Sequence, residues 1–217
     1  MKESRIQTTV LSVKMIPNAD PALLRSLSAR SGERSLGLIT TDCDDVSYAA
    51  LDEATKKAQV RVLYAQSMYA GAKNASTRLA GEFIGILAGS DPEEVRASLN
   101  AVISYIENEA SFVSACDDDS IVYFAHCISR TGTYLSGLAS VEEGTAMAYL
   151  IAPPLEAMLG IDAALKSANV EIKLFYGPPT NTNFAGGLLV GAQSACKAAC
   201  EAFAEKICEI AALPCAY

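Results

Sequence analysis

A short sequence pattern occurs twice in this chain, as ATKKAQV at residues 54–60 and as ALKSANV at residues 164–170. The two copies lie 110 positions apart in a chain of 217 residues, about half of its length. Each copy has an aspartate four residues before a lysine, a spacing that favours ion pairs on a helix. The pairs are Asp52 with Lys56 and Asp162 with Lys166. The repeat therefore predicts two copies of one domain.

The similarity between the two halves continues beyond this pattern. Residues 80–86 match residues 185–191 at an offset of 105, so the loop before this run is five residues shorter in the second copy. Apolar residues at helical spacing follow in each copy, over 92–107 and 194–211. Each copy predicts the order strand, helix, strand, loop, strand, helix, and thus an α/β (α+β) fold. The predicted domains are residues 1–110 and 111–217.

Composition and charge exclude several classes of protein. Hydrophobic residues make up 51% of the chain, yet no uninterrupted apolar run is long enough to span a bilayer. So much apolar surface favours burial between subunits, and we expect an oligomer. The N-terminus lacks the features of a secretion signal, so we expect a cytoplasmic protein without a membrane partner. The net charge of −8 has the wrong sign for binding nucleic acid.

Side chains that carry chemistry give little support for an enzyme. His126 is the single histidine and lies in a strand-like run, where a structural role is more typical than a general base. Seven cysteines, an odd number, indicate reduced thiols. Three of them share one face of the last helix: Cys196, Cys200 and Cys208. No accompanying spacing points to a metal, so we interpret this stripe as packing and predict no catalytic and no metal site.

Acidic residues distinguish the first copy from the second. Where the second copy has Ala152, Pro154, Leu155 and Gly187, the first has Asp42, Asp44, Asp45 and Glu82. Asp44 and Asp45 fall at the start of a predicted helix, where ordinary capping explains them equally well. Glu82 begins an apolar strand, where a carboxylate is harder to explain without a partner. If these elements are neighbours, the cluster suits a small ammonium ligand.

Two long polar loops, residues 66–77 and 177–184, occupy equivalent points of the two copies. Each carries one large aromatic residue, Tyr69 in the first loop and Phe184 in the second. Loops of this kind lie at the surface and can gate a passage. An ordinary solvent loop anchored by an aromatic side chain is the alternative interpretation.

Residues 162–172 (DAALKSANVEI), followed by GGLLVG at 186–191, resemble the core pattern of the bacterial microcompartment (BMC) shell domain. Residues 12–17 and 125–130 resemble the closing strand of that domain, but each precedes its repeat, which indicates a circular permutation. Over nearly the whole chain, the sequence is similar to the EutL family, the permuted trimeric shell proteins of ethanolamine-utilisation microcompartments. The segments that carry this similarity are 34–45, 69–71, 148–156 and 160–167.

The resemblance implies two tandem circularly permuted BMC domains, each a small, mainly antiparallel sheet with flanking helices. It implies a flat homotrimer of six such domains that tiles with other shell proteins around ethanolamine-degrading enzymes. The chain would then be a structural protein of the microcompartment shell in the cytoplasm and not an enzyme. A soluble ligand-binding regulator with a duplicated α/β domain is the alternative. An enzyme would need a base other than His126.

The resemblance also implies roles for particular residues. A small pore would bind ethanolamine through Asp44, Asp45, Glu82 and Phe112, the last placed by resemblance alone. The loops that gate a central opening would include Tyr69, Gly71, Asn181, Asn183 and Phe184. Lys56 and Lys166 would contact neighbouring tiles. No cofactor is required, and cobalamin, too bulky for a small pore, is a candidate for binding or passage at the central opening.

Overall fold

The computed structural model describes residues 4–67, 82–180 and 182–215. Its chain forms two compact units. One unit comprises residues 8–110 together with 132–135, and the other comprises 1–7, 111–131 and 136–217. The first seven residues thus cluster with the C-terminal part of the chain, and residues 132–135 cluster with the N-terminal part.

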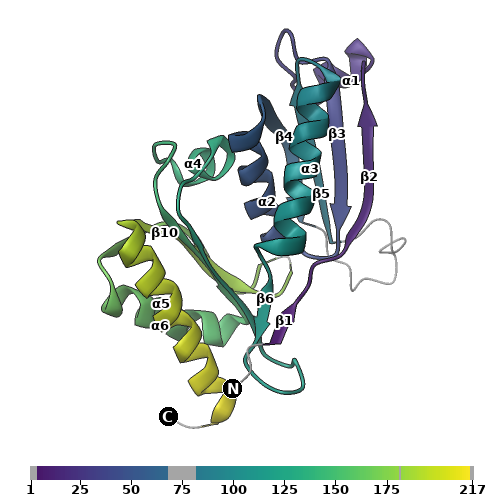
Figure 1. The fold of residues 1–217 in the computed structure, drawn as a ribbon. Helices are drawn as coiled ribbons and strands as arrows, with labels where there is room; N and C mark the ends of the chain where they lie inside the picture. The colour runs from purple at the N-terminus through teal and green to yellow at the C-terminus, as the bar shows by residue number, and fades with distance from the viewer. Residues whose placement is uncertain (1–3, 68–81, 181, 216–217) are drawn as a thin grey trace. The chain divides into compact units, whose positions relative to one another are not determined.

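The unit of residues 8–110 is a four-stranded antiparallel sheet with two long helices on one face (Figure 1). The strands lie in the order β2-β3-β5-β4. They are β2 (Val10–Ile16), β3 (Ser35–Thr41), β4 (Val60–Ser67) and β5 (Phe83–Gly89). The helices are α1 (Pro21–Ser26), α2 (Asp44–Lys57) and α3 (Pro92–Asn108). Glycines let the helices approach the sheet, since a Cβ at Gly37 would lie 2.9 Å from Val95 of α3.

The other unit repeats this arrangement and adds two short strands. Its six-stranded sheet has the order β1-β6-β7-β8-β10-β9. The strands are β1 (Ser4–Ile6), β6 (Phe112–Ser114), β7 (Val122–Ile128), β8 (Met147–Ala152), β9 (Val170–Tyr176) and β10 (Ala185–Gly191). The helices are α5 (Pro154–Ser167), α6 (Gln193–Ala212) and the end of α4 (Thr133–Ala139), whose first three residues cluster with the unit of residues 8–110. The order β7-β8-β10-β9 reproduces β2-β3-β5-β4, so both copies share one topology.

The structure confirms the order of elements predicted for each copy. The helix predicted over 92–107 is α3, and the one over 194–211 is α6, which extends it by one residue at each end. The predicted ion pairs form on α2 and α5, with Nζ–Oδ2 distances of 3.7 Å for Lys56–Asp52 and 2.6 Å for Lys166–Asp162.

The two segments that resemble a closing strand are strands in the structure, β2 and β7. Each pairs antiparallel with the first strand of its own repeat, β2 with β3 and β7 with β8. A strand that closes the sheet of its domain therefore comes before the repeat in the chain, as a permuted order requires.

The cysteine stripe of α6 packs into an apolar core. Cys196 and Cys200 are buried, and Cys208 lies against the same cluster, together with Phe203 and Ile207. A Cβ at Gly160 of α5 would lie 2.7 Å from the Phe203 ring, so the two helices approach closely there. Within residues 4–67, 82–180 and 182–215, no three His, Cys, Asp or Glu side chains are grouped to hold a metal ion.

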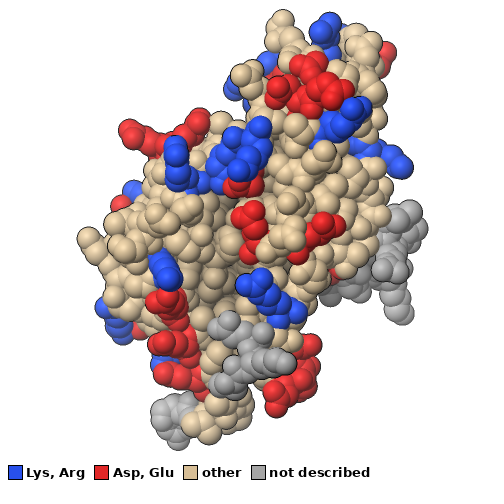
Figure 2. All heavy atoms as spheres, in the orientation of Figure 1, with Lys and Arg blue, Asp and Glu red and all other residues tan. Residues whose placement is uncertain are grey.

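On the face shown in Figure 2, acidic and basic side chains are interspersed rather than gathered into a basic patch. In the part of the chain that the structure describes, no helix is long and apolar enough to cross a membrane.

Candidate functional site

A tight turn between β3 and α2 positions the acidic residues of the first copy. The hydroxyls of Thr41 and Ser47 lie 2.7 Å apart, and both lie within hydrogen-bond distance of the Cys43 carbonyl, at 2.9 and 2.7 Å. Thr41 and Ser47 are fully buried. These contacts hold the turn in one conformation, so that α2 begins at Asp44.

Asp44 and Asp45 form the start of α2, as the sequence predicts, and both are buried. The Asp44 carboxylate accepts the Asp45 backbone N–H at 2.9 Å. Carboxylates in the first turn are also stabilised by the helix dipole. The N-cap residue, Cys43, makes no side-chain cap hydrogen bond. The capping interpretation thus accounts for part of the interactions of this pair.

Asp42 precedes this pair and is fixed against the start of β2. Its carboxylate accepts the Thr9 N–H at 2.7 Å, and its own N–H donates to the Thr9 carbonyl at 3.2 Å. The Asp42 side chain is exposed, so the carboxylate keeps access to solvent.

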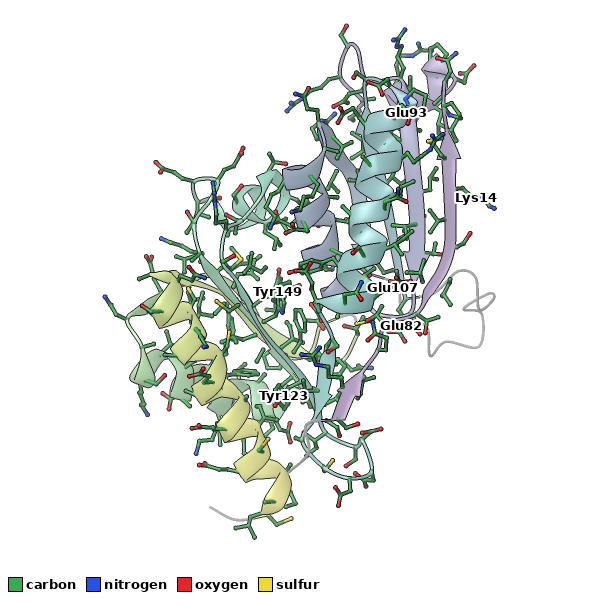
Figure 3. All side chains as sticks on the ribbon, viewed as in Figure 1. Lys14, Glu82, Glu93, Glu107, Tyr123 and Tyr149 are labelled. Carbon is green, nitrogen blue, oxygen red and sulfur yellow. The ribbon has the colours of Figure 1, made fainter. Side chains whose placement is uncertain are left out.

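Glu82 lies directly before β5, at the same edge of the sheet as the end of β3 (Figure 3). Its backbone N–H donates to the Thr41 carbonyl at 2.8 Å, which extends the pairing of β3 and β5 by one bond. Burial raises the pKa of the half-buried Glu82 carboxyl, and the negative charges of Asp44 and Asp42 raise it further. The elements that carry the acids are therefore neighbours, as the cation hypothesis requires.

Tyr48 is a further member of this cluster that the sequence analysis did not single out. Its hydroxyl lies 2.6 Å from the Ser67 Oγ, and its ring meets Phe83 edge to face at 5.0 Å. Burial raises the pKa of Tyr48, and Asp44 and Asp45 add to the effect against the opposing Ser67 hydrogen bond. The feature of the sequence that could have identified Tyr48 is its position one helical turn after Asp44.

Cys43, in the turn before α2, lies close to the same negative charges of Asp44 and Asp45. Burial raises the pKa of its thiol, and the charges of Asp45 and Asp44 raise it further. Glu82, Tyr48 and Cys43 thus all lie in a negative potential that their own neighbours create. A bound cation would lower the electrostatic cost of this arrangement.

Phe112 belongs to the other compact unit, where it is buried in β6. Its ring stacks on Phe124 with centroids 5.5 Å apart and meets Phe184 at 5.7 Å and an interplanar angle of 67°. Phe124 in turn stacks on His126 at 5.3 Å, so the single histidine lies in an aromatic cluster. The roles predicted for Phe112 and Phe184 are separate, but their rings are in contact in the structure.

The second predicted gating loop ends in a tight turn. Thr180 N–H donates to the Phe184 carbonyl at 2.8 Å, and Asn183 N–H donates to the Thr180 carbonyl at 3.0 Å. Asn183 has φ of 65°, a left-handed conformation that asparagine tolerates better than most residues. Three other residues assigned to the gate lie outside the described residues: Tyr69, Gly71 and Asn181.

The two lysines predicted at tile edges differ in their surroundings. The side chain of Lys56 is 24% exposed and lies 2.5 Å from Glu53 and 3.7 Å from Asp52. The side chain of Lys166 is 75% exposed and lies 2.6 Å from Asp162. The two positions are equivalent in the repeat, so the surroundings of α2 and α5 must differ.

Comparison with known proteins agrees with the fold and the repeat. The BMC domain model matches residues 35–116. The chain is 61% identical to the bacterial microcompartment shell protein EutL of Clostridium perfringens, over 99% of both chains. It is 48% identical to EutL of Escherichia coli K12, over 96% of this chain and 95% of that protein.

Solved structures give the same result. The ethanolamine utilization protein EutL of Leptotrichia buccalis superimposes with a TM-score of 0.96 at 59% identity, and both chains are fully covered. The trimeric bacterial microcompartment shell protein PduB shares the fold, with a TM-score of 0.75 at 18% identity over 94% of this chain and 89% of that one. The curated relatives are named as shell proteins and not as enzymes. The chain belongs to the EutL family of bacterial microcompartment shell proteins.

Proposed function

We propose that this chain is a structural tile of an ethanolamine-utilisation microcompartment shell, assembled as a homotrimer that packs edge to edge with other shell proteins. The observation that carries this proposal is the repeated strand order, β2-β3-β5-β4 and β7-β8-β10-β9, in a chain that matches EutL proteins over its full length. Three chains with two such domains each supply six similar units, the number that a hexagonal tile needs.

The acidic cluster of the first unit is the proposed ethanolamine site. Asp44, Asp45 and Glu82 supply negative charge at the edge where β3 ends and α2 begins. The ammonium of ethanolamine would offset the repulsion that raises the pKa of Glu82, and its hydroxyl suits hydrogen bonding to nearby polar groups. Phe112, assigned to the small pore by resemblance alone, lies in the other compact unit and is not part of the cluster described here.

The proposed gate consists of the loops that join β4 to β5 and β9 to β10. Asn183 and Phe184 are the described members of this set, and the Phe184 ring contacts Phe112 within the same compact unit. Passage or binding of cobalamin at the central opening belongs to the same proposal, and no resident cofactor is part of it. Opening would be a rearrangement between two loop states.

Electron microscopy of the concentrated protein tests the tile directly. Flat sheets with a hexagonal lattice are the expected result, because edges that carry Lys56 and Lys166 would then meet across neighbouring tiles. Isolated particles at every concentration and salt condition, without ordered contacts between their edges, would contradict the proposed tile.

A further inference from the structure

One stripe of α2 is contacted at Asp52 by a segment from much later in the chain, residues 132–135 of the same compact unit. The buried Asp52 carboxylate accepts the backbone N–H of Gly132 at 2.7 Å and of Leu135 at 2.8 Å. Thr55 Oγ1 accepts the Thr133 N–H at 3.0 Å. The backbone approach is close, since a Cβ at Gly132 would lie 2.2 Å from Thr55 Oγ1. This first turn of α4 is therefore docked on α2.

The stripe consists of four positions of α2 at helical spacing, and the repeat gives their equivalents on α5 at an offset of 110. The equivalent pairs are Asp45 and Leu155, Ala49 and Leu159, Asp52 and Asp162, Lys56 and Lys166. On α2 the first three are at most 7% exposed. On α5, Leu155 is 59% and Leu159 is 45% exposed, and the Asp162 side chain is 62% exposed. The α5 stripe is thus left open by the described part of the chain.

The docked segment also has an equivalent in the other copy. Helix α1 begins at Pro21 and α4 at Thr133, each between the first two strands of its copy, and this correspondence pairs Leu23 with Leu135. An equivalent backbone hydrogen bond precedes each helix. Ala19 N–H donates to the Arg34 carbonyl at 2.9 Å, and Thr131 N–H donates to the Thr145 carbonyl at 3.0 Å. Leu135 is fully buried, whereas Leu23 is 41% exposed. The chain therefore carries one docked pair, and the equivalent leucines of a second pair are exposed.

We propose that the α5 stripe, Leu155, Leu159 and Asp162, binds the first turn of α1, with Leu23, from a second copy of this chain. The inference rests on the proposed ring of copies, for which it supplies the contact. Because α1 and α5 are different elements of the chain, a contact between them across copies is head-to-tail, and such contacts close into a ring when the rotation between copies permits.

The contact between copies differs in chemistry from the one within the chain. Asp20 corresponds to Gly132 and uses its carboxylate to accept the Ala22 N–H at 2.7 Å. The Asp20 carboxylate would repel a buried aspartate on the partner helix, so it disfavours the kind of contact that Asp52 makes with residues 132–135. Leucines replace Asp45 and Ala49 on the other side, so apolar burial can contribute to this contact. The exposed leucines on both surfaces are the groups that this burial would remove from water.

Two variants test the contact from its two sides, L159E on α5 and L23E on α1. Both positions are exposed in the single chain, so folding should persist, and circular dichroism and melting check this. Each variant is expected to raise the dissociation constant of assembly by about 100-fold, seen as single chains by sedimentation velocity. L213E, at a residue that is 69% exposed outside both surfaces, is the control and should assemble like the wild type.

Mixing the two variants gives the sharper readout. Each retains the half that the other lacks, so a 1:1 mixture should form dimers of one L159E chain and one L23E chain, and no closed ring. If both variants assemble as well as the wild type does, this contact is wrong, whereas the proposed ring is not affected. A wild-type protein that stays a single chain at all concentrations would remove the proposed ring, and the contact with it.

Discussion

The rings of Phe112 and Phe184 meet edge to face, with centroids 5.7 Å apart and an interplanar angle of 67°. Phe112 lies in β6, and Phe184 closes the turn before β10. A displacement of either ring removes packing from the other, because buried aromatic pairs have few alternative arrangements. The contact connects a residue assigned to the small pore with one assigned to the gate.

Substitution of Phe112 by alanine should destabilise the protein by about 3 kcal/mol, because the buried ring leaves a cavity beside Phe124 and Phe184. Urea denaturation measures the change. Phe175→Ala is the matched control, since this phenylalanine is 50% exposed and should cost less than about 1 kcal/mol. Equal losses in the two variants would show that the Phe112 ring is not held in the aromatic cluster.

Substitution of Glu82 by glutamine should weaken ethanolamine binding by about tenfold, since it removes one charge from the acidic cluster and keeps the shape of the side chain. Isothermal titration calorimetry measures the affinity, and sedimentation should show unchanged assembly. Glu201→Gln alters an exposed carboxylate on α6 and serves as the control. Unchanged affinity in Glu82→Gln would remove Glu82 from the site.

The pH dependence of binding follows from the raised pKa of Glu82. Ethanolamine affinity should fall as the pH is lowered through this pKa, which lies above the usual value of 4.5, because protonation removes negative charge while the ammonium stays charged. The effect of pH on the stability of the protein has the opposite sign. A carboxyl with a raised pKa in the folded state contributes stability below its unfolded pKa and loses it as the pH rises through the folded one.

Titrations of the wild type and of Glu82→Gln between pH 4 and 7 measure both effects. The variant should show a flatter pH dependence of affinity and of stability. Identical pH profiles in the two proteins would show that the Glu82 carboxyl does not govern this range.

Substitution of Asp52 by alanine should cost about 2 to 3 kcal/mol of stability, because it leaves the N–H groups of Gly132 and Leu135 without their acceptor. Burial raises the pKa of Asp52 against the effect of these two hydrogen bonds. Chemical denaturation measures the loss. Glu201→Ala, at an exposed surface pair with a distance of 3.9 Å, should change stability by less than about 0.5 kcal/mol. A loss no greater than in this control would contradict the docking of residues 132–135 on α2.

The sequence predicted those parts of the fold that depend on local pattern. Helical spacing located α3 and α6 within one residue, and the acids at 44 and 45 correctly marked the start of α2. Whether Asp44 and Glu82 are neighbours was left open by the sequence, and the structure answers it by pairing the end of β3 with the start of β5.

Local sequence patterns could not predict contacts between distant parts of the chain. Asp52 was recognised only as the partner of Lys56, and its amide donors lie 80 and 83 residues away. The Phe112–Phe184 contact likewise joins segments with no shared periodicity. Tyr48 was missed because an aromatic residue on a helix predicts core packing, and only the fold places its hydroxyl beside Ser67.

Native mass spectrometry of the wild-type protein tests most directly whether two domains per chain build a six-unit ring. A dominant particle of three chains is expected, about 68 kDa for a chain of 22.8 kDa. A spectrum dominated by the 22.8 kDa single chain at micromolar concentration would contradict it.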